Sequence, residues 1–134
     1  MGENGRGKHA IRFVIPYPTT KKGRAEWSKK YGLNAYWAGK HWAQRKNDAD
    51  YWHNLVHSEL RRQGIRGSFD RPVWITMRWN DGLDIDNHAA MGKMIVDALK
   101  GVVIRDDNRK YLRAILHTWH DDDWIEVEIE EWRG

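Results

Sequence analysis

The amino-acid sequence predicts a single α+β domain in which two main helices pack against a small mixed β-sheet. Its 134 residues match the length of one ordinary domain. Stretches in which apolar and polar residues alternate are interspersed with stretches of helical period, in the order β-α-β-α-β-β. The last two strand-like stretches flank a short acidic turn, which is typical of a hairpin. This order favours one α+β domain over a purely helical or purely β fold.

The N-terminal third is predicted to hold one strand and a long loop. Residues 1–9 are glycine-rich and charged, so we expect a disordered basic terminus, followed by a domain over residues 10–134. Residues 11–15 read as a strand that Pro16 and Pro18 end. Residues 19–46 show no clean period and carry many Lys, Trp and Gly residues, which predicts a long loop with a binding role.

Two helices are predicted from apolar residues that recur on one face. The first spans residues 48–63, and its inner face carries Trp52, Leu55, Val56, Glu59 and Leu60. Asn47 or Asp48 can cap its start, and Gly64 ends it. The second spans residues 87–100, and its inner face carries Ala90, Met91, Met94, Ile95 and Ala98.

Three further strands complete the predicted sheet. Residues 73–79 alternate with period two, which places one set on the core face: Val73, Ile75, Met77 and Trp79. Asp81 and Gly82 then turn the chain. Residues 110–119 and 124–130 form the closing hairpin, in which we expect Ile125, Val127 and Ile129 to face the core and Glu126, Glu128 and Glu130 to face water.

The formal net charge of +4 is unevenly distributed. Residues 1–46 contain 11 Lys or Arg residues and two acidic residues, whereas residues 47–134 contain 12 basic and 17 acidic residues. Cationic side chains bind phosphates with release of counterions, and aromatic rings stack on unpaired bases. The basic part therefore predicts nucleic-acid binding, with phosphate contacts expected at Lys29, Lys30, Lys40, Arg45 and Lys46. Three of its tryptophans either stack on bases or join the core: Trp27, Trp37 and Trp42.

Composition and spacing exclude several other chemistries. The chain has no cysteine, so it forms no disulfide, uses no catalytic thiolate and builds no cysteine zinc site. His53 and His57 have the spacing of a metalloprotease zinc pair, but Asn54 stands where that motif requires its general-base Glu. No apolar run approaches the ~20 residues of a membrane span, and we find no secretory signal, so we expect a cytoplasmic protein without membrane contact.

Two acidic stretches lie at the ends of predicted elements. Asp84 and Asp86 come between the strand at 73–79 and the second helix, and Asp107 comes between that helix and the next strand. If the three carboxylates converge, a cation is needed to offset their mutual repulsion. Carboxylate oxygens suit Mg²⁺ or Mn²⁺, whose chemistry includes phosphodiester hydrolysis. Alternatively, an aspartate before a helix is an ordinary N-cap, and residues 106–108 are an ordinary turn.

Three motifs occur in a fixed order around these aspartates: Asp84-Ile-Asp86-Asn87, then residues 93–101 with the sequence KMIVDALKG, then Asp106-Asp107-Asn108. Upstream, residues 34–42 read NAYWAGKHW. With these motifs the chain resembles the RusA-like Holliday-junction resolvases, in particular the phage-type members, from residue 11 to residue 131.

The resemblance implies a homodimeric endonuclease of bacterial or phage origin that binds four-way DNA junctions and nicks paired strands with Mg²⁺. By motif position it implies that Asp84, Asp86 and Asp107 hold the metal and that Lys93 is the catalytic lysine. The family's lysine follows the second aspartate by four residues, where this chain has Ala90, and Lys93 lies three residues further on. Two alternatives stay open: a module that binds branched DNA without cleaving it, and a nuclease of the same fold that acts on other DNA.

Overall fold

A computed structural model describes residues 10–33, 35 and 42–134. The predicted disordered terminus at 1–9, together with Trp37 and Lys40, lies outside the described residues. The elements follow one another as β1 (Ala10–Pro16), α2 (Lys21–Tyr31), α4 (Trp42–Arg62), β2 (Val73–Trp79), the short 3-10 helix η1 (Ile85–His88), α5 (Ala89–Leu99), β3 (Leu112–Trp119) and β4 (Trp124–Glu131).

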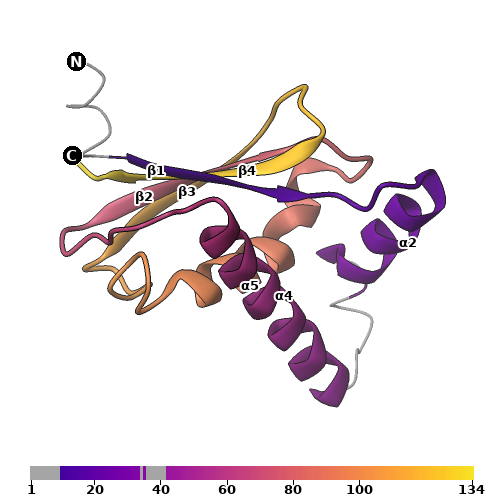
Figure 1. Cartoon of the computed structure of the whole chain (residues 1–134), viewed down its shortest axis with the longest axis horizontal. Helices are drawn as coiled ribbons and strands as arrows, with labels where there is room; N and C mark the ends of the chain where they lie inside the picture. The colour runs from indigo at the N-terminus through magenta and orange to yellow at the C-terminus, as the bar shows by residue number, and fades with distance from the viewer. Residues whose placement is uncertain (1–9, 34, 36–41) are drawn as a thin grey trace.

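The four strands form one mixed sheet in the order β1-β4-β2-β3. Strand β4 pairs antiparallel with both β1 and β2, and β2 pairs parallel with β3. The prediction that residues 110–119 and 124–130 pair as a hairpin is therefore wrong, because β2 lies between β3 and β4 in the sheet. The three α-helices of the described residues lie on one side of this sheet (Figure 1). The prediction of a single α+β domain with a mixed sheet is confirmed, although three helices stand where two were predicted.

Helix α2 is the element that the sequence reading missed. Residues 21–31 and 42–46 are helical, so the prediction of one long loop over residues 19–46 is wrong for these segments. The Thr20 hydroxyl caps α2 by accepting a hydrogen bond from the Gly23 amide at 2.9 Å. The buried residues of this helix are Trp27 and Tyr31. Two apolar anchors one turn apart are too few to show a helical period.

Those two anchors pack on Trp52 of α4. The Trp52 side chain is fully buried, and its ring centroid lies 6.1 Å from that of Trp27 and 5.5 Å from that of Tyr31. Helix α4 begins at Trp42 and not at the predicted residue 48. Asp48 therefore lies buried inside the helix and is not its N-cap. The aromatic cluster therefore fixes α2 against α4.

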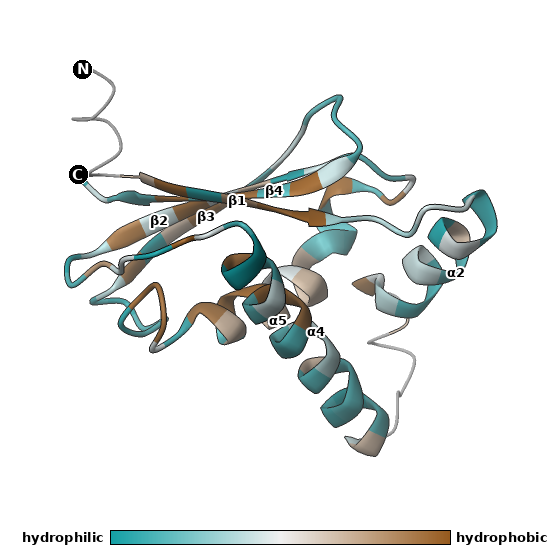
Figure 2. Cartoon of the chain, in the orientation of Figure 1, coloured by the Kyte–Doolittle hydropathy of each residue, from teal (hydrophilic) through white to brown (hydrophobic). Residues whose placement is uncertain are grey.

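The core lies between the sheet and helices α4 and α5. The four predicted core residues of β2 are each 0% exposed, as the period-two pattern required: Val73, Ile75, Met77 and Trp79. Figure 2 shows hydrophobic residues along the strands and a hydrophilic outer face on α4. Helix α5 packs closely against His117 of β3 at Gly92. A Cβ atom at position 92 would lie only 2.8 Å from the His117 ring. Glycine at position 92 thus permits this packing.

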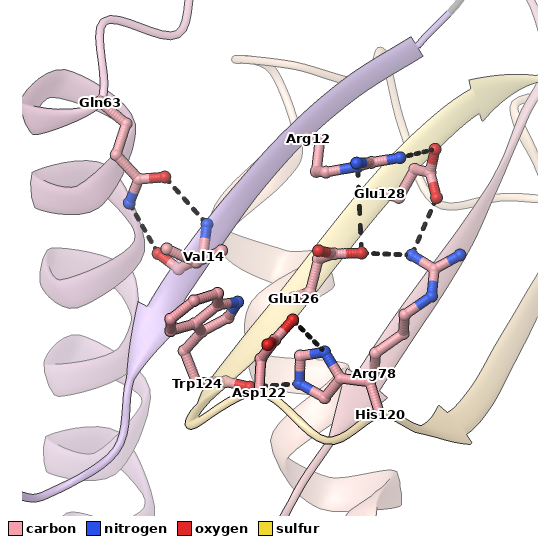
Figure 3. Close-up of polar contacts among 9 residues, drawn as sticks. All are labelled: Arg12, Val14, Gln63, Arg78, His120, Asp122, Trp124, Glu126 and Glu128. Carbon is pink, nitrogen blue, oxygen red and sulfur yellow. Dashed lines mark hydrogen bonds and ion pairs between the residues drawn. The ribbon is translucent and has the colours of Figure 1, made fainter.

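The opposite face of the sheet carries an ion-pair network instead of three water-facing glutamates (Figure 3). Arg78 donates hydrogen bonds to Glu126 at 2.6 Å and to Glu128 at 2.8 Å, and Arg12 donates to Glu128 at 3.2 Å. The prediction that Glu128 faces water is wrong, since the residue is only 8% exposed. Burial raises the pKa of Glu128, but the hydrogen bonds from Arg78 and Arg12 outweigh it and hold that pKa below its usual value.

Strand β3 forms one edge of the sheet and exposes apolar side chains. Ile115, Leu116 and Trp119 are each between two-fifths and one-half exposed. Apolar side chains on an edge strand are typical of a surface that another chain covers.

Candidate functional site

The loop between β2 and η1 presents Asp84 and Asp86 to solvent. Asp84 occupies the N-cap position of η1, but its side chain makes no capping hydrogen bond. Both carboxylates are exposed, and neither has a hydrogen-bond or ion-pair partner within the described part of the chain. The ordinary N-cap role is therefore not the one that Asp84 fills. The pair is accessible to a cation.

The residues that flank this pair in the chain belong to a buried polar network around Asp81. The Tyr17 hydroxyl donates to Asp81 at 2.8 Å, and it accepts a hydrogen bond from the Asn80 amide at 2.8 Å. The His88 Nε2 atom lies 2.8 Å from the same Asp81 carboxylate. The Leu83 amide also donates to Asp81, at 3.0 Å. Three separate segments thus converge on one carboxylate, which fixes the backbone on either side of Asp84.

Hydrogen bonds and burial set the protonation of Asp81 and Tyr17. The Nδ1 atom of His88 lies 3.0 Å from the backbone oxygen of Ile85, and Nε2 faces the Asp81 carboxylate. A carboxylate only accepts, so Nε2 donates to it. Burial raises the pKa of Asp81, but the hydrogen bonds from His88 and Tyr17 outweigh it and lower that pKa. Burial raises the pKa of Tyr17 well above its usual range, which keeps its proton in place.

Sequence reasoning missed these network residues. Asp81 looked like a turn residue, yet its side chain is only 4% exposed. His88 is 0% exposed. Tyr17 and Asp81 are 64 positions apart in the chain. No local pattern in one sequence signals a contact of that range.

Asp107, the third predicted metal ligand, lies elsewhere. Because β2 and β3 are parallel, the loop that follows β2 and the loop that precedes β3 lie at opposite ends of the sheet (Figure 1). Helix α5 separates them, with 11 residues that span about 16 Å at 1.5 Å per residue. Residues 101–104 form a tight turn, in which the Gly101 amide donates to the Ile104 carbonyl at 2.8 Å.

Asp107 instead takes part in a small charged cluster at the C-terminal end of α5. The Lys100 ammonium lies 3.5 Å from Asp107 and 3.5 Å from Asp97, and Lys93 pairs with Asp97 at 3.1 Å. Attraction to Asp107, followed by that to Asp97, raises the pKa of Lys100. Within the described ranges, no three acidic or histidine side chains are grouped closely enough to hold one metal ion.

The predicted cationic residues gather where α2, α4 and α5 meet. Lys30, Arg45, Lys46 and Lys93 line one cleft. Lys29 lines a neighbouring depression that also includes Leu83 and Asn87, the residues on either side of the Asp84–Asp86 pair. Lys93, the predicted catalytic lysine, therefore lies with the predicted phosphate contacts. The basic end of α2 adjoins the acidic loop.

The histidine pair and two of the tryptophans singled out in the sequence lie outside the acidic loop. The His57 ring donates to the backbone carbonyl of Ala98 at 2.7 Å, which ties α4 to α5. The His53 ring lies beside it at an interplanar angle of 48°, with ring centroids 4.0 Å apart. Trp27 belongs to the core, and Trp42 is 71% exposed. These positions give no sign of a zinc pair.

Comparison with protein-family models and with curated proteins finds no match to this chain. None of the helices among the described residues is long and apolar enough to span a membrane. Geometry and side-chain chemistry at the Asp84–Asp86 loop thus carry the functional conclusion.

Proposed function

We propose that the protein is a Mg²⁺-dependent endodeoxyribonuclease of RusA-like type that nicks four-way DNA junctions. The observation that supports this most is the state of Asp84 and Asp86. Both carboxylates are exposed, and the Asp84 side chain makes no capping hydrogen bond. The buried Tyr17–Asp81–His88 network holds the loop that carries them. Reactive groups on a rigid support keep the precise geometry that catalysis requires. The adjoining lysines of α2 supply the positive charge that a phosphate backbone needs.

The donor set at this loop fits a magnesium ion. Mg²⁺ is commonly bound by one or two carboxylates, with waters and substrate phosphates in its other positions. Asp84 and Asp86 provide such a pair, and Mn²⁺ fits the same oxygens. A bound ion supplies polarisation of a phosphoryl oxygen and a lowered pKa for a bound water. Asp107 stays a predicted ligand that the fold holds at the other end of α5.

The side chains around the loop have separate tasks in the proposed reaction. Lys29 and Lys30 bind the phosphates that flank the scissile bond and orient the strand. Lys93 neutralises charge that develops on the phosphoryl oxygens or protonates the leaving oxygen. Its pairing with Asp97 holds the ammonium on the cleft side of α5.

A homodimer is part of the proposal, because a four-way junction has two-fold symmetry and an isologous pair of sites matches it. Ile115 and Trp119, exposed on one face of the edge strand β3, support a surface that a second copy covers, and Leu116 is exposed on the other face of the same edge. Sedimentation of the purified protein measures this directly. A monomer at micromolar concentration would contradict paired nicking by a stable dimer.

The function is tested by incubating the protein with a labelled four-way junction and with a matched linear duplex, each with Mg²⁺ or with EDTA. We expect paired nicks in the junction with Mg²⁺ and none with EDTA. Binding without nicks at every divalent metal would contradict the enzyme. Equal cutting of the linear duplex would contradict junction selectivity and favour a nuclease for other DNA.

One observation favours a second candidate, a module that binds branched DNA without cleaving it. Asp107 pairs with Lys100 and does not join Asp84 and Asp86. In that case the acidic loop holds no catalytic ion, and the basic residues of α2, α4 and α5 alone carry the function. The same assay decides between the two, since the module binds junctions and leaves them intact.

A further inference from the structure

The cleft between α2, α4 and α5 has features that phosphate binding alone does not explain. Its volume is about 260 Å³, and apolar surface makes up most of its lining. A groove that only tracked a phosphate backbone would need cations and little apolar surface. Small side chains on the two facing helices open the space, because Ala49 lines it from α4 and Ala90 from α5.

An aromatic ring forms part of the lining. Tyr31 stacks on Tyr51 with ring centroids 5.7 Å apart and an interplanar angle of 7°, and it also contacts Trp52 edge-on. Burial, with smaller contributions from Tyr51 and Asp48, raises the pKa of Tyr31 to about 12. The phenol therefore stays neutral and adds no negative charge to the cleft. The Met94 side chain contributes further apolar surface from α5.

The charges around this apolar surface favour an anionic ligand. Among the residues that the structure describes, four cationic ones line the cleft, against the two acidic residues Asp48 and Asp97. Lys93 and Lys46 each take part in an ion pair, with Asp97 at 3.1 Å and with Asp50 at 3.3 Å. Ion pairs between exposed side chains contribute little to stability, so a phosphate can displace them. The ligand that fits is flat and apolar on one side and anionic on the other.

We infer that this cleft takes an unpaired nucleotide of a DNA strand, with its base on the apolar surface and its phosphate at the basic residues. This inference rests on the proposed action on DNA and specifies which part of the substrate the protein holds. Unpaired bases occur where a junction opens, and extrusion of a base is easiest where pairing is already lost. Bases of every kind present a π-face, so the cleft selects unpaired structure and not a particular base.

The experiment compares two labelled single strands by fluorescence anisotropy in EDTA, where no nicking occurs. One strand is intact, and the other carries abasic residues that keep every phosphate. The wild-type protein should bind the intact strand about tenfold more tightly, because stacking and burial of a base contribute on that scale. Equal affinity for the two strands would overturn the inference.

A filling substitution locates the effect. Ala49→Phe occupies the cleft from an exposed position on α4, so we expect the intact-to-abasic ratio to fall to about one while the salt dependence of binding stays unchanged. Ala49→Leu should give an intermediate ratio. Ser58→Phe, at an exposed position of α4 outside the cleft lining, is the matched control and should keep the wild-type ratio.

Two results on the variants would overturn the inference. One is an Ala49→Phe protein that keeps the wild-type ratio. The other is an Ala49→Phe protein that loses affinity for both strands by the same factor, which would show that the cleft holds only backbone. Circular dichroism and thermal unfolding confirm that the variants are folded. The graded Ala49→Leu change supplies the test if the phenylalanine disturbs α4.

Nicking of a junction with Mg²⁺ is scored separately, which keeps this inference apart from the proposed function. A protein that nicks junctions but does not distinguish intact from abasic strands contradicts the cleft assignment alone. A protein that prefers intact strands through Ala49 but never nicks contradicts the endonuclease alone.

Discussion

The His88 imidazole meets the Asp81 carboxylate at 2.8 Å in the interior of the protein, where their side chains are 0% and 4% exposed. The Nε2 atom donates to the carboxylate, so this contact is a buried hydrogen bond to a charged group. The two residues flank the loop that carries Asp84 and Asp86. The contact between His88 and Asp81 supports the loop and leaves the Asp84 and Asp86 carboxylates accessible from solvent.

Replacing Asp81 should destabilise the whole domain. Asp81→Asn weakens three buried hydrogen bonds that the carboxylate accepts from Tyr17, His88 and the Leu83 amide, so we expect the free energy of unfolding to fall by about 3–5 kcal/mol. Tyr17→Phe removes one hydrogen bond of the same network and should cost about 1–3 kcal/mol. Urea denaturation measures both. An Asp81→Asn protein that loses less stability than Tyr17→Phe would contradict the central role of the Asp81 carboxylate.

Replacing Asp86 should leave stability unchanged and abolish nicking. Its carboxylate is exposed, so Asp86→Asn is expected to change the free energy of unfolding by no more than about 0.5 kcal/mol. Calorimetric titration with Mn²⁺ should show weakened binding. Asp121→Asn, at an exposed position of the β3–β4 turn, is the matched control and should keep both activities. Nicking by Asp86→Asn at the wild-type rate would refute the site.

Asp107→Asn tests the predicted metal ligand that lies apart from Asp84 and Asp86. Because Asp107 pairs with Lys100 at the other end of α5, we expect this variant to retain most of the nicking rate. A loss as large as that of Asp86→Asn would show that Asp107 reaches the metal after all. Mixing the two inactive variants would then be informative, since recovered activity means that a second copy supplies Asp107.

The salt dependence of DNA binding reports the phosphate contacts. Arg45→Gln combined with Lys46→Gln should lower the slope of log affinity against log salt by about two, at close to one unit per lost phosphate contact. The double variant Arg61→Gln with Arg66→Gln changes two exposed arginines outside the cleft and should leave the slope unchanged. An unchanged slope in the first double variant would show that these side chains only solubilise the protein.

The Glu128 network predicts a stability that depends on pH. The hydrogen bonds from Arg78 and Arg12 lower the pKa of Glu128 in the folded state, so its contribution is present above the unfolded-state pKa and is lost as the pH falls through the folded-state pKa. Glu128→Gln should cost about 1–2 kcal/mol near neutral pH and much less below about pH 4. Urea denaturation across this range checks it, with Glu130→Gln as control. A cost that does not change with pH would contradict the ionic network.

Sequence periodicity predicted the parts of this fold that local pattern controls. The alternation over residues 73–79 identified four fully buried side chains, because one face of that strand packs against helices. Helix α2 was not predictable, since its burial depends on Trp52, a residue 25 positions beyond Trp27. The strand pattern at 73–79 and the helical pattern that follows correctly predicted Asp84 and Asp86 in the loop after β2. The distance between them and Asp107 depends on the parallel pairing of β2 with β3, which no local pattern reveals.

The order of strands in the sheet also determines when the protein can fold during its synthesis. Strand β4 is made after the other three strands of this sheet, yet it lies between β1 and β2. Until residues 124–131 leave the ribosome, β1 has no strand to pair with, and β2 lacks its antiparallel neighbour. The acidic loop is therefore attached to an unfinished sheet until β4 has emerged, and the geometry at Asp84 and Asp86 is complete only after that point.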